Sequence, residues 1–171
     1  LDGSAIEWVR AFEEVGIKRV PKPSNFMREI SEPKIFNKDK SVIAITPSNK
    51  LTIISTIDFS YKAIGKQTFV IDLNPKCYVD LIAPARTFGF KDQFQQLGEL
   101  GLIKGGSLEN ALVCDGDNWV NPPLRFANEP IRHKILDLIG DLALVGLPKA
   151  QIIVYKGSHS LNALLASSLK I

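Results

Sequence analysis

Three short runs rich in β-branched residues constrain the fold more than any other feature of this sequence. They cover residues 41–46, 51–59 and 67–73, and the segments between them, Pro47-Ser48-Asn49-Lys50 and Gly65-Lys66, carry turn signals. We interpret the runs as an antiparallel meander. Later in the chain we expect helices at 75–83, 92–102, 128–145 and 161–170, a hairpin at 111–120 and a buried strand at 152–155. Strands first, with helices between and after them, predict an α+β fold of layered sheet and helices rather than a doubly wound fold.

Composition narrows the class of protein. With 45% apolar and 23% charged residues in 171, the chain is globular and neither disordered, collagenous nor coiled-coil. Its net charge of +3 is too small for a non-specific nucleic-acid binder, but it leaves room for a small anionic ligand. Cys77 and Cys114 lack a CxxC spacing, which favours a reducing, cytoplasmic setting. No apolar run approaches the roughly 18 residues of a membrane span, so we expect no stable membrane insertion.

The first 25 residues contain a helix and a linker. Asp2-Gly3-Ser4 precedes an apolar stripe that runs to Val15, and Gly16 is in position to stop the helix. This stripe needs a partner. Pro21-Lys22-Pro23 then breaks the helical pattern. Because the first residue is Leu1 rather than Met, we expect the chain to start inside a longer protein.

The segment 128–145 is the most informative helix. Its main apolar face is made by residues at three-and-four spacing: Ile131, Ile135, Leu138, Leu142 and Val145. Other apolar residues lie elsewhere on the circumference, so the helix is expected to be covered on more than one side. Polar residues in such a helix are costly unless they are paired or bind something. His133, Asp137 and Asp141 are such residues, and they stand at i, i+4 and i+8 along one stripe.

His133 and Asp137 could ligate one metal ion. An imidazole and a carboxylate one helical turn apart can both reach a Zn²⁺ ion at about 2.0–2.2 Å. The alternative is an ordinary hydrogen-bonded pair on a solvated face. A catalytic zinc normally takes three protein ligands and a water, so this pair alone is an incomplete site.

The second histidine, His159, follows the turn Lys156-Gly157-Ser158 between a buried strand and a helix. The positive end of a helix N-terminus disfavours a charged imidazole, so a protonated His159 needs a carboxylate neighbour, for which Asp141 is the candidate. Paired in this way, His159 could act as a general acid. Alternatively, it is a capping or surface residue.

Two further features are open to two interpretations each. The segment Ala85-Arg86-Thr87-Phe88-Gly89-Phe90 offers a hydroxyl, a guanidinium and two aromatic rings, which suit a pocket wall with a donor. It could equally be a loop packed onto the core by its phenylalanines. Lys134 could neutralise a phosphate, or it could simply be solvated.

Five motifs in order resemble the zinc-dependent UDP-3-O-acyl-N-acetylglucosamine deacetylases of lipid A biosynthesis. They span the chain almost end to end, and together they are highly specific. The motifs are Leu1-Asp2-Gly3-Ser4-Ala5, Thr56-Ile57-Asp58-Phe59, the segment from Ala85 to Phe90, the run from Ile131 to Leu142, and Tyr155-Lys156-Gly157-Ser158-His159-Ser160-Leu161-Asn162.

The resemblance implies two similar α+β domains whose helices pack between two sheets. Residues 1–20 would be the last helix of the first domain, residues 21–23 a linker, and residues 24–171 the second domain. The N-terminal domain of the same protein would then be the missing partner. Lys-Gly-Ser-His at 156–159 departs slightly from the Lys-Ser-Gly-His that is frequent in the family.

The resemblance also implies roles for the residues at the reaction centre. His133 and Asp137 would be zinc ligands, and Asp141 would orient His159. His159 would stabilise the tetrahedral intermediate and protonate the leaving amine. Thr87 would donate a hydrogen bond to the developing oxyanion.

Other matching positions would contact the substrate. Phe88 and Phe90 would line the passage for the acyl chain. Asp58, Phe59 and Lys134 would lie near the UDP part of UDP-3-O-acyl-N-acetylglucosamine.

The implied reaction is hydrolysis of the N-acetyl amide, with zinc as Lewis acid and a glutamate as base for the attacking water. In the family, the third zinc ligand and this glutamate lie in the first domain, and neither is found in this sequence. We therefore expect the 171 residues alone to be inactive or nearly so. A second hypothesis is a truncated, non-catalytic UDP-lipid binding or interaction module, and a third is an unrelated α+β domain.

Overall fold

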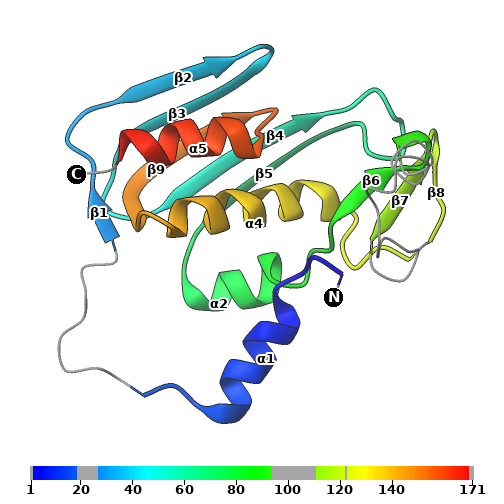
Figure 1. Cartoon of the computed structure of the whole chain (residues 1–171), viewed down its shortest axis with the longest axis horizontal. Coiled ribbons are helices and arrows are strands. Elements are labelled where there is room, and N and C mark those ends of the chain that lie inside the picture. The colour runs from blue at the N-terminus through cyan, green and yellow to red at the C-terminus, as the bar shows by residue number, and fades with distance from the viewer. Residues whose placement is uncertain (1, 19–26, 94–110, 122, 170–171) are drawn as a thin grey trace.

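The computed structural model describes residues 2–18, 27–93, 111–121 and 123–169 (Figure 1). Most of the helix predicted at 92–102, and the linker at 21–23, lie outside these residues. The described part contains two β-sheets and several helices, which confirms an α+β fold of layered sheet and helices. None of its helices combines the length and apolar character that crossing a bilayer requires.

The larger sheet has β9 near its centre. Its order is β2 (Lys34–Lys38), β3 (Ser41–Pro47), β9 (Leu147–Tyr155), β4 (Thr52–Asp58) and β5 (Lys66–Asp72). A further strand, β1 (Met27–Glu29), pairs with β9 in parallel. The smaller sheet consists of β6 (Phe88–Phe90), β7 (Leu112–Asp115) and β8 (Asn118–Trp119). The hairpin predicted around Gly116 is present as β7 and β8, with Gly116 at φ 63°.

The predicted antiparallel meander is wrong in one respect. β4 and β5 do form an antiparallel pair, but β3 and β4 are not neighbours, because β9 lies between them. β9 is antiparallel to β3 and parallel to β4. Consecutive strands pair only about two-thirds of the time, and here a long apolar strand from the end of the chain takes the central place. β9 is also longer than the strand predicted at 152–155.

The core lies between the large sheet and two helices. Helix α4 (Glu129–Ala143) packs on β4 and β5, and α5 (His159–Ser168) packs on β2 and β3, so both cover the same face (Figure 1). In the register of the sheet, Ile152 lies between Ile45 and Ile53, and all three side chains are fully buried. This alternation fixes which side of β9 faces the helices.

Two further helical segments lie on one side of α4 (Figure 1). The short helix α2 (Pro75–Cys77) continues as one π-helical turn at Tyr78–Ile82, and this turn contacts α4. The first helix, α1 (Ile6–Val15), ends at Gly16 as predicted, with φ 77° at this glycine. A hydrogen bond of 2.8 Å from the Ala5 N–H to the Ala83 carbonyl joins the start of α1 to the rest of the chain.

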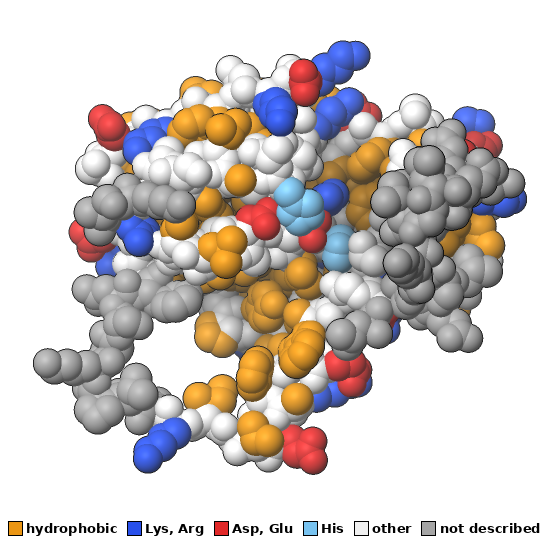
Figure 2. All heavy atoms as spheres, in the orientation of Figure 1, with side chains coloured by type: hydrophobic (Ala, Val, Ile, Leu, Met, Phe, Trp, Pro, Cys, Tyr) orange, Lys and Arg blue, Asp and Glu red, His pale blue; other side chains and the backbone are white. Residues whose placement is uncertain are grey.

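The apolar stripe of α1 is exposed. No residue of this helix is buried. Trp8, Phe12 and Val15 are 55%, 59% and 80% exposed. Figure 2 shows apolar side chains on the surface of this lower part of the molecule.

Candidate functional site

Helix α4 carries three of the candidate site residues. His133, Asp137 and Asp141 follow one another at one-turn intervals, and all three face the region where α5 begins. His159, the first residue of α5, comes close to both aspartates. Figure 2 shows the two histidines on one face of the molecule with acidic side chains beside them.

His133 is buried, with 6% of its surface exposed. Its Nδ1 lies 3.1 Å from the carbonyl oxygen of Ala85. Because a carbonyl can only accept, Nδ1 carries the proton and the lone pair is on Nε2. Burial lowers the pKa of His133 below its ordinary 6.5, and the attraction of Asp137 opposes this only in part. The imidazole is therefore neutral at pH 7, as a metal ligand must be.

The donor atoms of His133 and Asp137 fit one zinc ion. Nε2 of His133 lies 3.4 Å from Oδ1 of Asp137. Two ligands that each bind zinc at about 2.1 Å in a tetrahedral arrangement lie about 3.4 Å apart. Within the described residues, no group of three or more histidine, cysteine or acidic side chains is arranged to hold a metal ion. The pair thus offers two ligands of a site that needs more.

His159 is the first residue of α5, which begins two residues before the predicted start at 161. Ser158 is the N-cap of α5, and its hydroxyl accepts a hydrogen bond from the Leu161 N–H. This cap sets the direction of the first turn. Nδ1 of His159 lies 2.8 Å from Oδ2 of Asp141, and Nε2 lies 3.8 Å from Oδ2 of Asp137. The imidazole is exposed and can therefore meet a ligand from solvent.

Asn162, which was assigned no role from the sequence, also contacts the candidate site residues. Its side chain is buried, and Nδ2 donates to Oδ2 of Asp141 at 2.9 Å. The same carboxylate oxygen thus accepts from both Asn162 and His159. A signal was available, because Asn162 stands three residues after His159 and must share its face of the helix.

Thr87 lies between two residues that contact His133. Ala85 accepts the hydrogen bond from His133, and the Phe88 ring meets the imidazole edge-on at 6.4 Å between centroids. The N–H of Thr87 donates to the carbonyl of Asp2, at 3.0 Å. The Thr87 side chain packs closely on Gly3: a Cβ at position 3 would lie 2.7 Å from the Thr87 Cβ.

Arg86 forms an internal ion pair. Its guanidinium pairs with the buried carboxylate of Glu129, with Nε 2.9 Å from Oε1. The segment 85–90 could have formed a pocket wall with the Arg86 guanidinium as a donor, but this guanidinium pairs with Glu129 instead. Glu129 was not singled out from the sequence, since nothing local marks a partner 43 residues away.

The candidate aromatic residues gather in one cluster beside the histidines. The Phe59 ring lies 5.7 Å from that of Phe88 and 5.5 Å from that of Phe90. Tyr61 stacks on Phe90 at 4.3 Å. These distances suit aromatic pairs. Phe88 is the member that touches His133, so the cluster forms an apolar wall next to the candidate metal site.

The candidate charged residues are already paired with protein groups. Asp58 accepts from the Tyr155 hydroxyl at 2.9 Å and from Lys156 Nζ at 3.0 Å, and these bonds lower the pKa of Asp58. Lys134 Nζ lies 3.0 Å from Oδ2 of Asp137. Lys134 and Lys156 therefore each pair with an aspartate.

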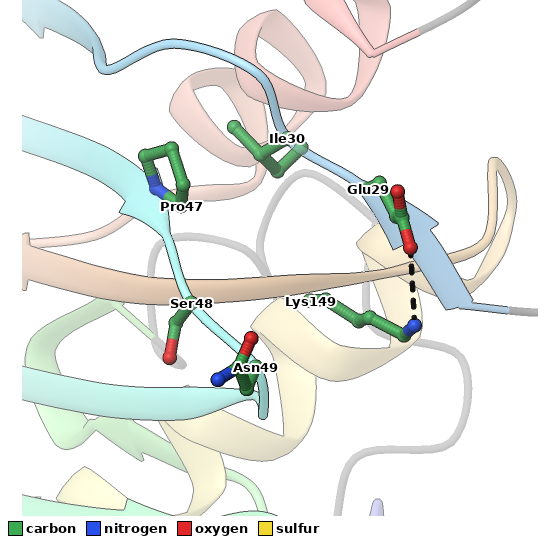
Figure 3. A pocket seen from close by; sticks show the side chains of 6 residues that line it. All are labelled: Glu29, Ile30, Pro47, Ser48, Asn49 and Lys149. Carbon is green, nitrogen blue, oxygen red and sulfur yellow. Dashed lines mark hydrogen bonds and ion pairs between the residues drawn. The ribbon is translucent and has the colours of Figure 1, made fainter.

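A separate pocket of about 690 Å³ lies at the other end of β9 (Figure 3). Glu29, Pro47 and Lys149 are among its lining residues, and Glu29 pairs with Lys149 at 3.3 Å. Lys149 and Tyr155 are six residues apart on an extended strand, which corresponds to about 20 Å. None of the candidate site residues lines this pocket.

Comparison with known proteins agrees with the motifs. Residues 1–170 match the LpxC family, described as UDP-3-O-acyl N-acetylglycosamine deacetylase. A UDP-3-O-acyl-N-acetylglucosamine deacetylase of Synechocystis sp. is 45% identical over 99% of this chain and 62% of its own length. The protein of that name in Nostoc sp. is 47% identical, with the same coverage of each chain.

A plant relative extends the comparison. The protein named probable UDP-3-O-acyl-N-acetylglucosamine deacetylase 1, mitochondrial, of Arabidopsis thaliana is 41% identical over 98% of this chain and 56% of its own length. The chain thus spans less than two thirds of the curated relatives it matches. Within that span the match runs almost from end to end. The chain therefore belongs to the UDP-3-O-acyl N-acetylglycosamine deacetylase family.

Proposed function

We propose that this chain supplies part of the active site of a zinc-dependent deacetylase that hydrolyses the N-acetyl group of UDP-3-O-acyl-N-acetylglucosamine, in lipid A biosynthesis. The observation that carries the proposal is the position of Asp137 between the two histidines. Its Oδ1 lies 3.4 Å from His133 Nε2, and its Oδ2 lies 3.8 Å from His159 Nε2. The proposed metal ligands, His133 and Asp137, therefore lie next to the proposed acid, His159. The family names of the relatives support the substrate class.

His133 and Asp137 hold the zinc in this proposal. When bound, zinc acts as a Lewis acid on the acetyl carbonyl and makes water a better nucleophile. The neutral tautomer of His133, fixed by the Ala85 carbonyl, keeps the Nε2 lone pair available. No third histidine, cysteine or acidic side chain among the described residues joins this pair in a metal-binding group, and the implied reaction also needs a base for the attacking water. We assign the remaining ligand and this base to another part of the same protein.

His159 and Thr87 handle charge and protons in the reaction. Water adds to the acetyl carbonyl, the C–N bond breaks, and acetate and a free amine are released. His159 donates the proton that the leaving amine needs, and Asp141 stabilises the imidazolium before transfer. The Thr87 hydroxyl donates a hydrogen bond to the oxyanion that forms on the carbonyl oxygen.

The substrate contacts follow from the residues around this centre. Phe88 and Phe90 offer an apolar wall for the acyl chain. Lys134, Asp58 and Phe59 are proposed to contact the UDP part. We also propose that residues 1–20 complete a first domain, that 21–23 link it to the second domain at 24–171, and that the protein works in the cytoplasm.

The test uses the protein as its gene encodes it, purified and freed of metal with a chelator. Acetate release from UDP-3-O-acyl-N-acetylglucosamine should be lost without zinc and restored by adding it. His133→Ala and Asp137→Ala should abolish zinc binding and activity. Asp80→Ala, which removes an exposed partner of Lys76, is the matched control and should leave both unchanged.

Two results would contradict the proposal. One is full deacetylation by the metal-free protein or by the His133→Ala variant. The other is full activity of the 171 residues alone, because the base and a ligand are assigned elsewhere. Binding of the substrate that persists after zinc removal and in His133→Ala, with no acetate release by the wild type, would favour the binding-module hypothesis.

A further inference from the structure

Glu129 is a fully buried carboxylate at the start of the helix that carries the candidate metal ligands. Its surface is 0% exposed. A buried carboxylate is costly unless hydrogen bonds satisfy its oxygens. Here four donors converge on it, and all of them come from arginine residues: the N–H, Nε and Nη2 of Arg86 at 3.0, 2.9 and 3.1 Å, and the N–H of Arg125 at 2.6 Å.

The bonds from Arg86 tie Glu129 to the segment that holds His133. Arg86 directly follows Ala85, whose carbonyl accepts the hydrogen bond from His133 Nδ1. Glu129 and His133 are one turn apart on α4, and their partners are adjacent in the chain. The helix and the segment are therefore joined at two successive points. Such a double attachment restricts sliding and rotation of one relative to the other.

Arg125, the second arginine, makes further contacts with the same segment. Arg125 donates from Nη1 to the Pro84 carbonyl at 2.7 Å, and its Nη2 pairs with Asp2 at 2.6 Å. The carbonyl of Asp2 in turn accepts the N–H of Thr87 at 3.0 Å. The backbone on both sides of Ala85 is thus fixed through the two arginines whose N–H groups Glu129 binds.

We propose that Glu129 is a positioning residue: by holding the Ala85–Thr87 segment against α4, it orients His133 and sets the place of Thr87. Glu129 does not touch the reacting atoms. It acts through Arg86 and Ala85 on the imidazole, and through the backbone on the threonine hydroxyl. The catalytic roles of His133 and Thr87 rest on the proposed zinc-dependent function. The geometric claim concerns only the side chains and backbone of this chain.

The experiment compares Glu129→Gln, Arg86→Lys and the matched control Glu7→Gln in the protein as its gene encodes it. Glutamine at 129 places an amide group where only an acceptor fits. Lysine at 86 keeps the charge but loses the fork that binds both carboxylate oxygens. Glu7 is exposed, and its ion pair within the described residues is with Arg10. The first readout is hydrogen exchange of the His133 Nδ1–H, followed by NMR in the metal-free protein. The second is the zinc dissociation constant, and the third is kcat.

Glu129→Gln should speed exchange of this ring N–H and weaken zinc binding, each by about tenfold. kcat should fall while KM stays close to the wild type, because the substrate contacts are not altered. Arg86→Lys should change the same quantities in the same direction, and it carries the test if Glu129→Gln does not fold. Glu7→Gln should match the wild type.

The proposal is overturned if the folded variants lose thermal stability while ring exchange and zinc affinity remain those of the wild type, since Glu129 would then be structural only. Failure of the zinc function looks different. The wild type would then bind no zinc and release no acetate, whereas the exchange of the His133 ring N–H in the metal-free protein would still show whether Glu129 holds it.

Discussion

Nδ1 of His159 lies 2.8 Å from Oδ2 of Asp141, although the whole of β9 separates the two residues in the chain. The contact joins the end of α4 to the first residue of α5. It leaves Nε2 of the imidazole on the side of Asp137, where the candidate metal pair lies. A general acid needs a carboxylate that binds one imidazole nitrogen and a reaction site next to the other nitrogen. Here Asp141 binds Nδ1, and Nε2 lies near the candidate metal pair.

Asp141→Asn should lower kcat by about 10²- to 10⁴-fold, the range that positioned proton transfer contributes. The amide cannot stabilise an imidazolium as a carboxylate does. Zinc content should be unchanged, because Asp141 is not one of the proposed ligands. Steady-state kinetics and metal analysis of the gene-encoded protein measure both. Asp80→Asn, an exposed aspartate paired with Lys76, serves as control. A kcat within twofold of the wild type would remove Asp141 from the mechanism.

Glu129 should make stability depend on pH in the acid range. Burial raises the pKa of Glu129, but hydrogen bonds from Arg86 and from the Arg125 N–H outweigh it and hold the pKa below the ordinary 4.5. A depressed carboxyl pKa gives stability that is present above pH 4.5 and lost as pH falls through the folded-state pKa. Breaking a buried pair costs about 3 kcal/mol at pH 7.

Urea unfolding of the wild type and Glu129→Gln at pH 7, 5, 4 and 3 measures this effect. The difference between the two proteins should be largest at pH 7 and 5 and shrink below pH 4.5. Glu7→Gln should differ little from the wild type at any of these pH values. A difference for Glu129→Gln that does not change with pH would contradict the depressed pKa.

Local features of the site were predictable because they follow from one helix. The spacing of His133, Asp137 and Asp141 puts them on one stripe of any α-helix, and Pro130 and Gly146 mark its ends in the sequence. The start of α5 was predicted less well. The helix begins at His159 and not at residue 161. Ser158, which caps that helix, was the available signal.

Contacts between distant segments could not be predicted in the same way. The Glu129 to Arg86 pair and the insertion of β9 between β3 and β4 depend on how the whole chain packs. The reason for glycine at position 157 is visible only in the structure, because a Cβ there would lie 2.7 Å from a Val154 methyl.

Gly3→Ala should disturb Thr87 and not only the backbone. Gly3 has φ 74°, and an added Cβ would lie 2.7 Å from the Thr87 Cβ. Gly16 has nearly the same φ, 77°, but nothing within 4 Å. Gly16→Ala therefore measures the conformational cost at φ 77° and ψ 160°, about 1–3 kcal/mol.

Gly3→Ala should lose about 1–3 kcal/mol more than Gly16→Ala, the usual cost of overpacking. It should also lower kcat, whereas Gly16→Ala should not. Urea denaturation and the deacetylase assay give the two quantities. Equal effects of the two substitutions would show that Thr87 accommodates the methyl group freely.

Arg28→Met should destabilise the fold, because methionine cannot donate hydrogen bonds to the two helix ends that Arg28 caps. Arg28 donates from Nε to the Val145 carbonyl and from Nη1 to the Leu169 carbonyl, at the C-termini of α4 and α5. Cations at helix C-termini and their hydrogen bonds together contribute about 1–2 kcal/mol. Thermal unfolding should show this loss. Arg10→Met removes only an exposed pair with Glu7 and should cost at most about 0.5 kcal/mol. A loss no larger than that for Arg28→Met would contradict the capping role.

The exposed stripe of α1 should make the 171-residue chain self-associate. Trp8, Phe12 and Val15 lie at i, i+4 and i+7, so their side chains form one continuous apolar surface. Trp8→Lys with Phe12→Lys should abolish the association measured by light scattering. The control is Ile35→Lys with Val70→Lys, because these exposed residues lie on the sheet and not on α1, in one register row with Ile153 between them. If association persists in the α1 variant but is lost in the control, the contact lies on the sheet and not on α1. A monomeric wild type would contradict self-association through the α1 stripe.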